Sequence, residues 1–373
     1  MSLTCLLPDT TAFIQRAPRM LIGSDWVEAA DGQTMPLHNP ATGEVLCVVP
    51  RATPADVDRA VLAARQAFDD SAWTRTRPRE RQNLLWKLAD LMQRDAELLA
   101  QLECLNNGKS AVVAQVMDVQ LAIDFLRYMA GWATKIEGST VDVSVPLMPN
   151  DQFHSFIRRE AVGVVGAIVA WNFPLLLACW KLGPALATGC TVVLKPADET
   201  PLTALKLAEL VLEAGYPEGV FNVVTGTGIT AGSALTHNPL VDKLTFTGST
   251  AVGKQIGKIA MDSMTRVTLE LGGKSPTIVM ADADLKTAAA GAASAIFLQS
   301  GPGLLRRFQA VCTAQAFRQC GGGHQRHRQR HEAGQRSGSE RRNGPVDFGP
   351  PAGARLRLHR KGPGKRCDHR LWW

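Results

Sequence analysis

The chain has 373 residues, of which 45% are apolar, so it can bury a sizeable core and is not a wholly disordered protein. Its formal net charge of +7 is unevenly distributed, because residues 302–373 hold 16 Lys and Arg against four Asp and Glu, whereas residues 1–301 hold 25 against 30. No run reaches the ~18–20 apolar residues of a membrane span, so no membrane-spanning helix is expected.

The N-terminal part is predicted to be a loose leader over residues 1–19, with no apolar stretch long enough for a cleavable signal peptide. The eight cysteines are scattered and form no disulfide framework, which indicates reduced thiols in the cytoplasm. Strand-like pieces follow, and then amphipathic helices whose apolar stripes are typical of a core. The strands are expected at 20–28 and 34–50, and the helices at 53–70, 77–106 and 110–136.

From Ile157 onward, short apolar strands alternate with helices. Strands are expected at 162–170, 191–194, 221–224 and 243–246, and helices at 174–188, 201–214, 229–236 and 249–261. This alternation predicts an α/β fold with a doubly wound parallel sheet covered on both faces, an architecture that binds nucleotides. Gly226-Thr-Gly228 is only a weak fragment of the usual glycine-rich dinucleotide fingerprint.

Three strand ends carry residues suited to binding a ligand, because open sheets bind ligands beyond the carboxyl ends of their strands. Asn172 could donate from its amide to a developing oxyanion, although it could equally cap the helix that follows. Lys195 and Asp198 could bind ribose hydroxyls, with an exposed strand-end charge as the alternative for Lys195. Gly248 and Ser249 open a helix whose N-terminus favours a pyrophosphate.

A fourth candidate is Glu270, which stands between Leu269 and Leu271 and precedes Gly272-Gly273. These apolar neighbours predict a dry setting that would raise the pKa of the glutamate. A carboxylate of raised pKa can act as a general base near neutral pH.

Four motifs in this order resemble the NAD(P)-dependent aldehyde dehydrogenases, and the resemblance covers about residues 18–301. They are Trp171-Asn-Phe-Pro174, Lys195-Pro-Ala-Asp198, Phe246-Thr-Gly-Ser249 and Val267-Thr-Leu-Glu-Leu-Gly-Gly-Lys-Ser-Pro276. Within the family the likeness is greatest to the bacterial phenylacetaldehyde dehydrogenases, through Trp171–Gly189 and Leu21–Val27. The resemblance implies a dinucleotide-binding domain over 20–270, the start of a catalytic domain over 271–301, and a homo-oligomer in the complete family members.

The resemblance also implies roles for single residues. Asn172 would hold the aldehyde oxygen, Glu270 would activate water, and Lys181 could join a proton path or be a surface lysine. The substrate tunnel would include Phe173, Leu176 and Trp180, which suit an aryl aldehyde. The cofactor contacts would be Trp171, Lys195, Asp198, Gly228, Phe246, Gly248, Ser249 and Leu271. An acid at Asp198 favours NAD over NADP, because a carboxylate repels a 2′-phosphate.

The family's nucleophilic cysteine is missing. Its Phe-x-x-x-Gly-Gln-x-Cys pattern is matched from Phe297 to Gly301 and then stops, and Leu304 stands where the thiol belongs. Reading plausible codons in a neighbouring frame can restore a cysteine at that position and a family-like continuation. We therefore expect a frameshift at Gly301–Pro302 and a truncated catalytic domain, followed by a basic, disordered tail over 302–373.

The expected function is oxidation of an aldehyde, such as phenylacetaldehyde or another aryl aldehyde, to the acid with NAD. The chain itself is expected to be inactive, and a non-catalytic dinucleotide-binding fragment is the alternative. The tail's arginines also allow a nucleic-acid arm, but out-of-frame translation accounts for them better, and no nucleic-acid or membrane partner is expected. The spacing of Cys312, Cys320 and the nearby histidines matches no common zinc pattern, so no metal is expected.

Overall fold

The computed structural model describes residues 6–69, 72–148, 150–273, 276–280, 282–284, 286–288, 290–291 and 309–312. Its contacts divide the chain into two units, of which the first comprises Met1–Asn107 and Ala114–Leu271. The second comprises Gly108–Val113 and the chain from Gly272 onward. The predicted junction at Gly301–Pro302, the position of Leu304 and most of the tail lie outside the described residues.

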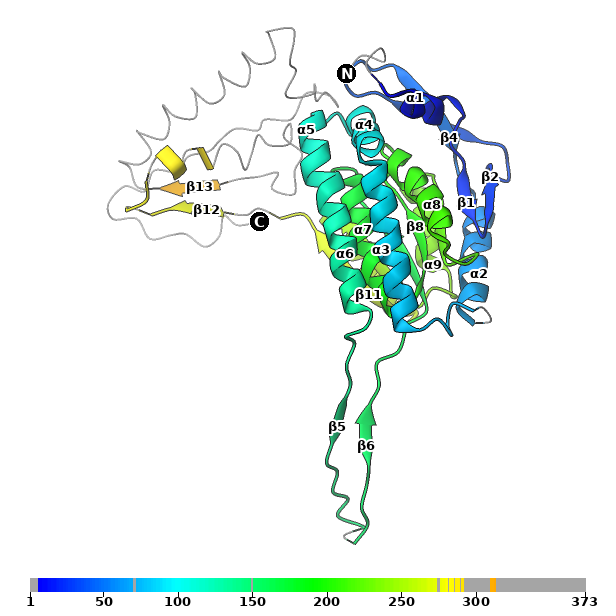
Figure 1. Cartoon of the computed structure of the whole chain (residues 1–373), viewed down its shortest axis with the longest axis vertical. Helices are drawn as coiled ribbons and strands as arrows, with labels where there is room; N and C mark the ends of the chain where they lie inside the picture. The colour runs from blue at the N-terminus through cyan, green and yellow to red at the C-terminus, as the bar shows by residue number, and fades with distance from the viewer. Residues whose placement is uncertain are drawn as a thin grey trace. The chain divides into compact units, whose positions relative to one another are not determined.

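A seven-stranded sheet lies at the centre of the first unit, among the helices that Figure 1 labels. Its strand order is β11-β10-β7-β8-β9-β1-β2. The five strands from β11 to β9 pair in parallel, while β1 joins β9 and β2 antiparallel. The doubly wound parallel sheet predicted from the sequence is thereby confirmed. The strands are β1 (Met20–Ile22), β2 (Asp25–Val27), β7 (Val164–Ile168), β8 (Thr191–Lys195), β9 (Phe221–Val223), β10 (Lys243–Gly248) and β11 (Arg266–Leu271).

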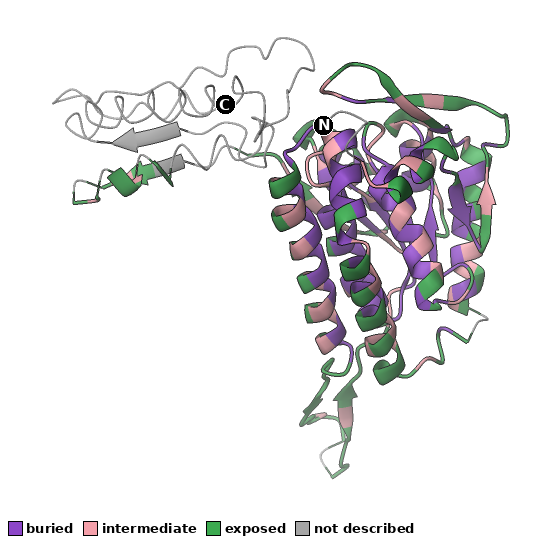
Figure 2. Ribbon diagram, turned by 45° about the horizontal axis from the view of Figure 1, so that its top comes forward, coloured by how far each residue is buried: buried purple, intermediate pink, exposed green. Residues whose placement is uncertain are grey.

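Helices cover both faces of this sheet because successive side chains of each strand point to opposite faces. In β7, Val165 and Ala167 belong to a core cluster shared with α3, α4, α6, α7 and α8, whereas Val164 belongs to a cluster shared with α2, α9 and α10. Figure 2 shows the resulting buried centre between exposed outer helix faces. The helices are α2 (Pro54–Asp69), α3 (Pro78–Arg94), α4 (Ala96–Asn107), α6 (Leu121–Trp132), α7 (Pro174–Thr188), α8 (Leu202–Ala214), α9 (Ser233–His237) and α10 (Thr250–Asp262), with π-helices η2 (Ala114–Gln120) and η3 (Gly228–Gly232).

The N-terminal segment differs from the loose leader that its sequence predicts. Helix α1 spans Pro8–Gln15, and its Phe13 and Ile14 are buried in the first core cluster. The side-chain oxygen of Gln101 in α4 accepts hydrogen bonds from the Leu7 amide and from the Thr10 hydroxyl. Burial of Phe13 and Ile14, together with the hydrogen bonds to Gln101, holds this short helix against the core, although its own sequence does not predict a helix.

Three two-stranded sheets complete the described structure. β3 (Thr34–His38) pairs antiparallel with β4 (Val45–Pro50), and β5 (Ser139–Val141) pairs antiparallel with β6 (Ser155–Ile157) in a hairpin between α6 and β7 (Figure 1). In the second unit, which also contains the short α5 (Ala111–Val113), β12 (Pro276–Val279) pairs in parallel with β13 (Gln309–Cys312). The expected disorder of the tail is therefore wrong for these four residues. Within the described part of the chain, no helix is long and apolar enough to cross a membrane.

Candidate functional site

The carboxyl ends of four parallel strands lie level at one edge of the sheet. Ile168 at the end of β7 is paired with Lys195 of β8 and with Phe246 of β10, and Gly248 is paired with Leu271 at the end of β11. The loops that follow these strands carry most of the residues that the sequence singles out. The topology thus brings them to one edge, which is where doubly wound sheets bind ligands.

Lys195 and Asp198 form the best-defined part of this edge. The Lys195 ammonium lies 2.7 Å from one carboxylate oxygen of Asp198 and donates to the Pro196 carbonyl oxygen at 2.8 Å. The other carboxylate oxygen accepts from the backbone amide of Gly228 at 3.3 Å. The Lys195 side chain is only 3% exposed, whereas that of Asp198 is 36% exposed. A buried cation therefore holds a carboxylate that remains open to a ligand.

The Trp171–Phe173 loop is half-buried between β7 and α7. The Asn172 side-chain oxygen is buried and has no hydrogen-bond partner among the described residues. Asn172 does not cap α7 either, since the N-cap is Phe173 and it makes no side-chain cap. Leaving a buried polar atom unpaired costs about 1–3 kcal/mol, so such an amide is typical of a ligand-binding position rather than of a structural cap.

The residues expected to line a substrate tunnel differ in their surroundings. Leu176 is buried in the core, Phe173 packs partly against that core, and Trp180 is 41% exposed. The Trp180 ring lies 6.3 Å from the ring of Phe125 on α6. Of these three side chains, Trp180 is the one most available to a ligand in the described structure.

Lys181, the neighbour of Trp180, is buried and not a surface lysine. Burial lowers its pKa below the ordinary 10.5, while the charge of Glu270 acts to raise the pKa and that of Lys243 to lower it. The structure thus places Lys181 within electrostatic range of Glu270, the other residue for which the resemblance implies a role in proton transfer. Lys243, which the sequence analysis missed, donates to the Thr268 hydroxyl at 2.8 Å.

Glu270 itself is exposed, so the dry setting predicted from its neighbours is wrong for the described structure. The reason is the two-residue period of a strand, which directs Leu269 and Leu271 to the face opposite Glu270. Those leucines pack against the second core cluster beneath α10. Leu269 and Leu271 are therefore partly buried against the core, but they do not shield the Glu270 carboxylate from solvent.

The turn after β10 has two distinct structural roles. A Cβ on Gly248 would lie 2.4 Å from the ring of Phe246, so the glycine makes room for a buried side chain of its own strand. The Ser249 hydroxyl caps α10 by accepting from the Val252 amide at 3.3 Å. Helix α10 begins directly after this strand end, and the dipole of a helix favours an anion at its N-terminus.

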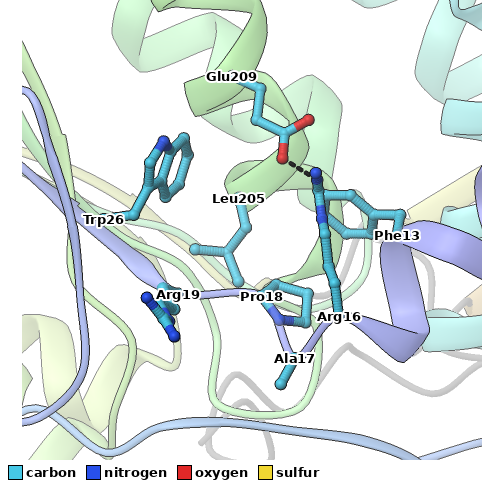
Figure 3. Close-up of a pocket in the computed structure, with 8 residues that line it drawn as sticks. All are labelled: Phe13, Arg16, Ala17, Pro18, Arg19, Trp26, Leu205 and Glu209. Carbon is cyan, nitrogen blue, oxygen red and sulfur yellow. Dashed lines mark hydrogen bonds and ion pairs between the residues drawn. The ribbon is translucent and has the colours of Figure 1, made fainter.

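A separate pocket lies between the N-terminal segment and α8, and Figure 3 shows its lining. It measures about 240 Å³ and is mostly apolar. Arg16 pairs with Glu209 along one wall. Its lining contains none of the predicted site residues. The lining residues are Phe13, Arg16, Ala17, Pro18, Arg19, Trp26, Leu205 and Glu209.

Comparison with known proteins identifies relatives for most of the chain. The model of the aldehyde dehydrogenase family matches residues 26–303. Over 296 residues the chain is 52% identical to the phenylacetaldehyde dehydrogenase of Pseudomonas fluorescens, covering 79% of this chain and 57% of the relative. It is 49% identical over 285 residues to the mitochondrial aldehyde dehydrogenase of Rattus norvegicus, covering 76% and 54%. The chain thus spans little more than half the length of these relatives.

Solved structures agree with this relationship. The NAD⁺ complex of an aldehyde dehydrogenase from Bacillus cereus aligns with a TM-score of 0.84 at 41% identity, covering 91% of this chain and 68% of that one. An NADP-dependent enzyme from E. coli aligns with a TM-score of 0.78 at 36% identity, covering 83% and 63%. Since relatives of both cofactor types share the fold, the choice between NAD and NADP depends on the ribose-binding residues.

Proposed function

Because the chain belongs to the aldehyde dehydrogenase family, we propose that residues 20–270 form the NAD-binding part of an enzyme that oxidises aldehydes to carboxylic acids. The observation that carries the proposal is the Lys195–Asp198 pair at the sheet edge, held by the Gly228 amide. A half-exposed carboxylate beside a buried ammonium fits the vicinal hydroxyls of an adenosine ribose. The level strand ends of β7, β8, β10 and β11 support a cofactor lying across them.

The remaining cofactor contacts would come from the neighbouring loops. Ser249 and the first turn of α10 would bind the pyrophosphate, and Leu271 would meet the nicotinamide through its backbone carbonyl. Trp171, Gly228, Phe246 and Gly248 would complete the cofactor site. The domain boundary that we propose after residue 270 is supported by the division of contacts after Leu271.

Three side chains would carry the chemistry that this chain contributes. Asn172 would donate from its amide to the aldehyde oxygen as negative charge develops there. Glu270 would accept a proton from water, with Lys181 nearby to relay protons. Bound NAD would supply the acceptor for the hydride that leaves the substrate. The substrate that we propose is an aryl aldehyde such as phenylacetaldehyde, supported by the 52% identical relative and by the exposed Trp180 ring.

The nucleophile is absent from the chain, since Leu304 stands at the cysteine position of the family pattern. We propose that the reading frame shifts at Gly301–Pro302, which is supported by the end of the family match at residue 303. Sequencing the gene across this junction tests the proposed shift. If neither neighbouring frame encodes a cysteine-containing continuation, the proposal is wrong. Without a thiol, aldehyde oxidation should fall by about 10⁶-fold relative to an intact enzyme.

A non-catalytic dinucleotide-binding protein is the second candidate, favoured by the same Leu304. NAD titration combined with aldehyde turnover separates the two functions. NADH production at ordinary enzyme rates would establish catalysis, whereas NAD binding without turnover would establish the second candidate. Among the described residues, Cys47, Cys179 and Cys190 form no disulfide, which supports our proposal of a reducing compartment such as the cytoplasm.

The cofactor preference gives the sharpest binding test. We expect the chain to bind NAD more tightly than NADP, because the Asp198 carboxylate accepts from a 2′-hydroxyl and repels a 2′-phosphate. Asp198→Asn should reduce this preference by about tenfold or more, since it removes the repulsive charge. Calorimetry with both cofactors measures the effect, and Asp262→Asn on the exposed end of α10 is the charge-matched control. Equal binding of the two cofactors by the unsubstituted chain would contradict the assignment of Asp198.

A further inference from the structure

The last turns of α4 carry three polar side chains that the sequence analysis did not single out, Glu103, Asn106 and Asn107. We call them the α4 bracket, and we infer that they are positioning residues that hold the Trp171 loop and the Asp198 loop in place for the cofactor. This inference rests on the proposed NAD-binding function. Glu103 is fully buried and Asn106 is 3% exposed, although they lie on a helix that otherwise buries mainly apolar residues.

The first observation is that the bracket caps two helices that lack caps of their own. Helix α7 begins after Phe173 and helix α8 after Pro201, and neither residue makes a side-chain cap. The Leu175 amide instead donates to Glu103 at 2.8 Å, and the Leu202 amide donates to Asn106 at 3.1 Å. A carboxylate and an amide oxygen, three residues apart on α4, thus satisfy first-turn amides of both helices.

The second observation is that the bracket also binds the loops that precede these helices. The Asn107 amide group donates to the Trp171 carbonyl oxygen, next to Asn172. The Asn106 amide group donates at 2.6 Å to the Glu199 carbonyl oxygen, next to Asp198. Each loop is therefore held twice, at its backbone carbonyl and at the first turn of the helix that it enters.

Helix α4 can contact both the Trp171 loop and the Asp198 loop because these loops follow the neighbouring strands β7 and β8. β7 and β8 are paired in register up to Ile168 and Lys195, and the Val169 amide extends the pairing to the Lys195 carbonyl oxygen. The Thr203 hydroxyl donates to the same Glu103 oxygen at 3.0 Å, which links α8 to the contact that caps α7. A displacement of α4 would move the Trp171 and Asp198 loops together, so the bracket sets the spacing between two predicted cofactor contacts.

The test removes one loop contact at a time from the full chain. Asn106→Asp keeps the acceptor for Leu202 and removes the donor to Glu199. Asn107→Ala removes the donor to Trp171 and leaves both helix caps in place. The control is Gln101→Ala on the same helix, which removes two hydrogen bonds to the N-terminal segment and touches neither loop.

Calorimetry with NAD, below the unfolding temperature of every variant, should show about tenfold weaker binding for Asn106→Asp and for Asn107→Ala. Gln101→Ala should bind NAD as the unsubstituted chain does. Equal affinity in all four proteins would overturn the inference, and so would an equal loss in the control. If Asn106→Asp does not fold, Asn107→Ala decides the question by the same measurement.

Hydrogen exchange without NAD separates this inference from the proposed function. We expect amides in residues 170–175 and 198–203 to exchange faster in the two bracket variants, with no change in these segments in Gln101→Ala. This result would stand even if the chain bound no NAD, in which case the proposed function alone would fail. Unchanged exchange in both segments would show that the bracket does not hold the loops.

Discussion

At the scale of single residues, Lys181 offers the clearest link between charge and stability. Its pKa is lowered in the folded chain, chiefly by burial, so the unfolded chain binds a proton more tightly than the folded chain up to the ordinary pKa of 10.5. The free energy of unfolding should therefore rise with pH across the window between the lowered pKa and 10.5. A buried amine kept at such a stability cost is typical of a functional position.

Lys181→Met should accordingly increase the free energy of unfolding at pH 7 by about 1 kcal/mol. The substitution removes a buried charge and replaces the lysine by an apolar side chain of similar length. The gain should shrink as the pH approaches 10.5. Urea unfolding at several pH values measures this dependence, and Lys258→Met on the exposed face of α10 is the control. A difference that does not change with pH would show that packing, and not charge, is responsible.

Glu270 can be tested in a chain whose reading frame is restored so that Leu304 becomes cysteine. If Glu270 activates the water that releases the acid, Glu270→Gln should give a rapid burst of NADH near one per site, followed by slow turnover. Rapid-mixing absorbance records both phases. A slowed burst would assign Glu270 to activation of the thiol instead, and unchanged turnover would leave it a structural carboxylate.

At the scale of elements, α10 shows how a helix approaches a strand at the predicted cofactor site. A Cβ on Gly253 would lie 2.4 Å from a Leu271 methyl group, whereas a Cβ on Gly257, one turn later, would meet only Leu269 at 3.6 Å. Both glycines lie inside the same helix. Alanine substitutions at these two glycines therefore distinguish the effect of helix propensity from the effect of a steric clash with Leu271.

Gly257→Ala should stabilise the chain by about 0.5–1 kcal/mol, because alanine is the better helix former. Gly253→Ala should destabilise it by about 1 kcal/mol, because Leu271 must move to accommodate the methyl group. Thermal unfolding monitored by circular dichroism compares the two variants. Equal stabilisation by both would mean that Leu271 is free to move aside, and the helix would then not depend on the glycine.

The elements of the central sheet could be predicted because their apolar runs are short and bounded. The predicted helix at 174–188 coincides with α7, and the predicted strand at 191–194 falls within β8. The sequence predicts one helix over 110–136, but the structure has the π-helix η2 between α5 and α6 in this region. No local sequence pattern predicts a π-helix there. The α4 bracket could not be predicted either, because Glu103 and Asn106 acquire their roles from partners about 70–100 residues away, where local periodicity carries no information.

At the scale of the whole molecule, the β5–β6 hairpin carries many exposed apolar side chains. They are Val141, Val143, Leu147, Met148, Phe153, Phe156 and Ile157. A two-stranded sheet with unpaired edges and apolar faces is a template for association. We therefore expect the chain to self-associate, with Phe156, which is 66% exposed, as a principal contact.

Sedimentation velocity at several concentrations should show species larger than the monomer. Phe156→Lys should shift the distribution toward the monomer, because a charge at this position opposes burial. Met264→Lys, at an apolar position outside the hairpin that is 80% exposed, is the control and should have no effect. Purely monomeric behaviour of the unsubstituted chain would contradict the expectation.

The pairing of β1 with β9 has a consequence for synthesis on the ribosome. β1 can pair with β2 as soon as both are made, but Leu21 also pairs with Val223 of β9, so the hairpin must wait for the rest of the sheet about two hundred residues further along the chain. At about 5–20 residues per second, translation alone imposes a delay of about 10–40 s. During that delay Met20 and Leu21, which are fully buried in the finished fold, have no sheet to cover them. The nascent β1–β2 segment is thus a natural client for a chaperone until β9 emerges.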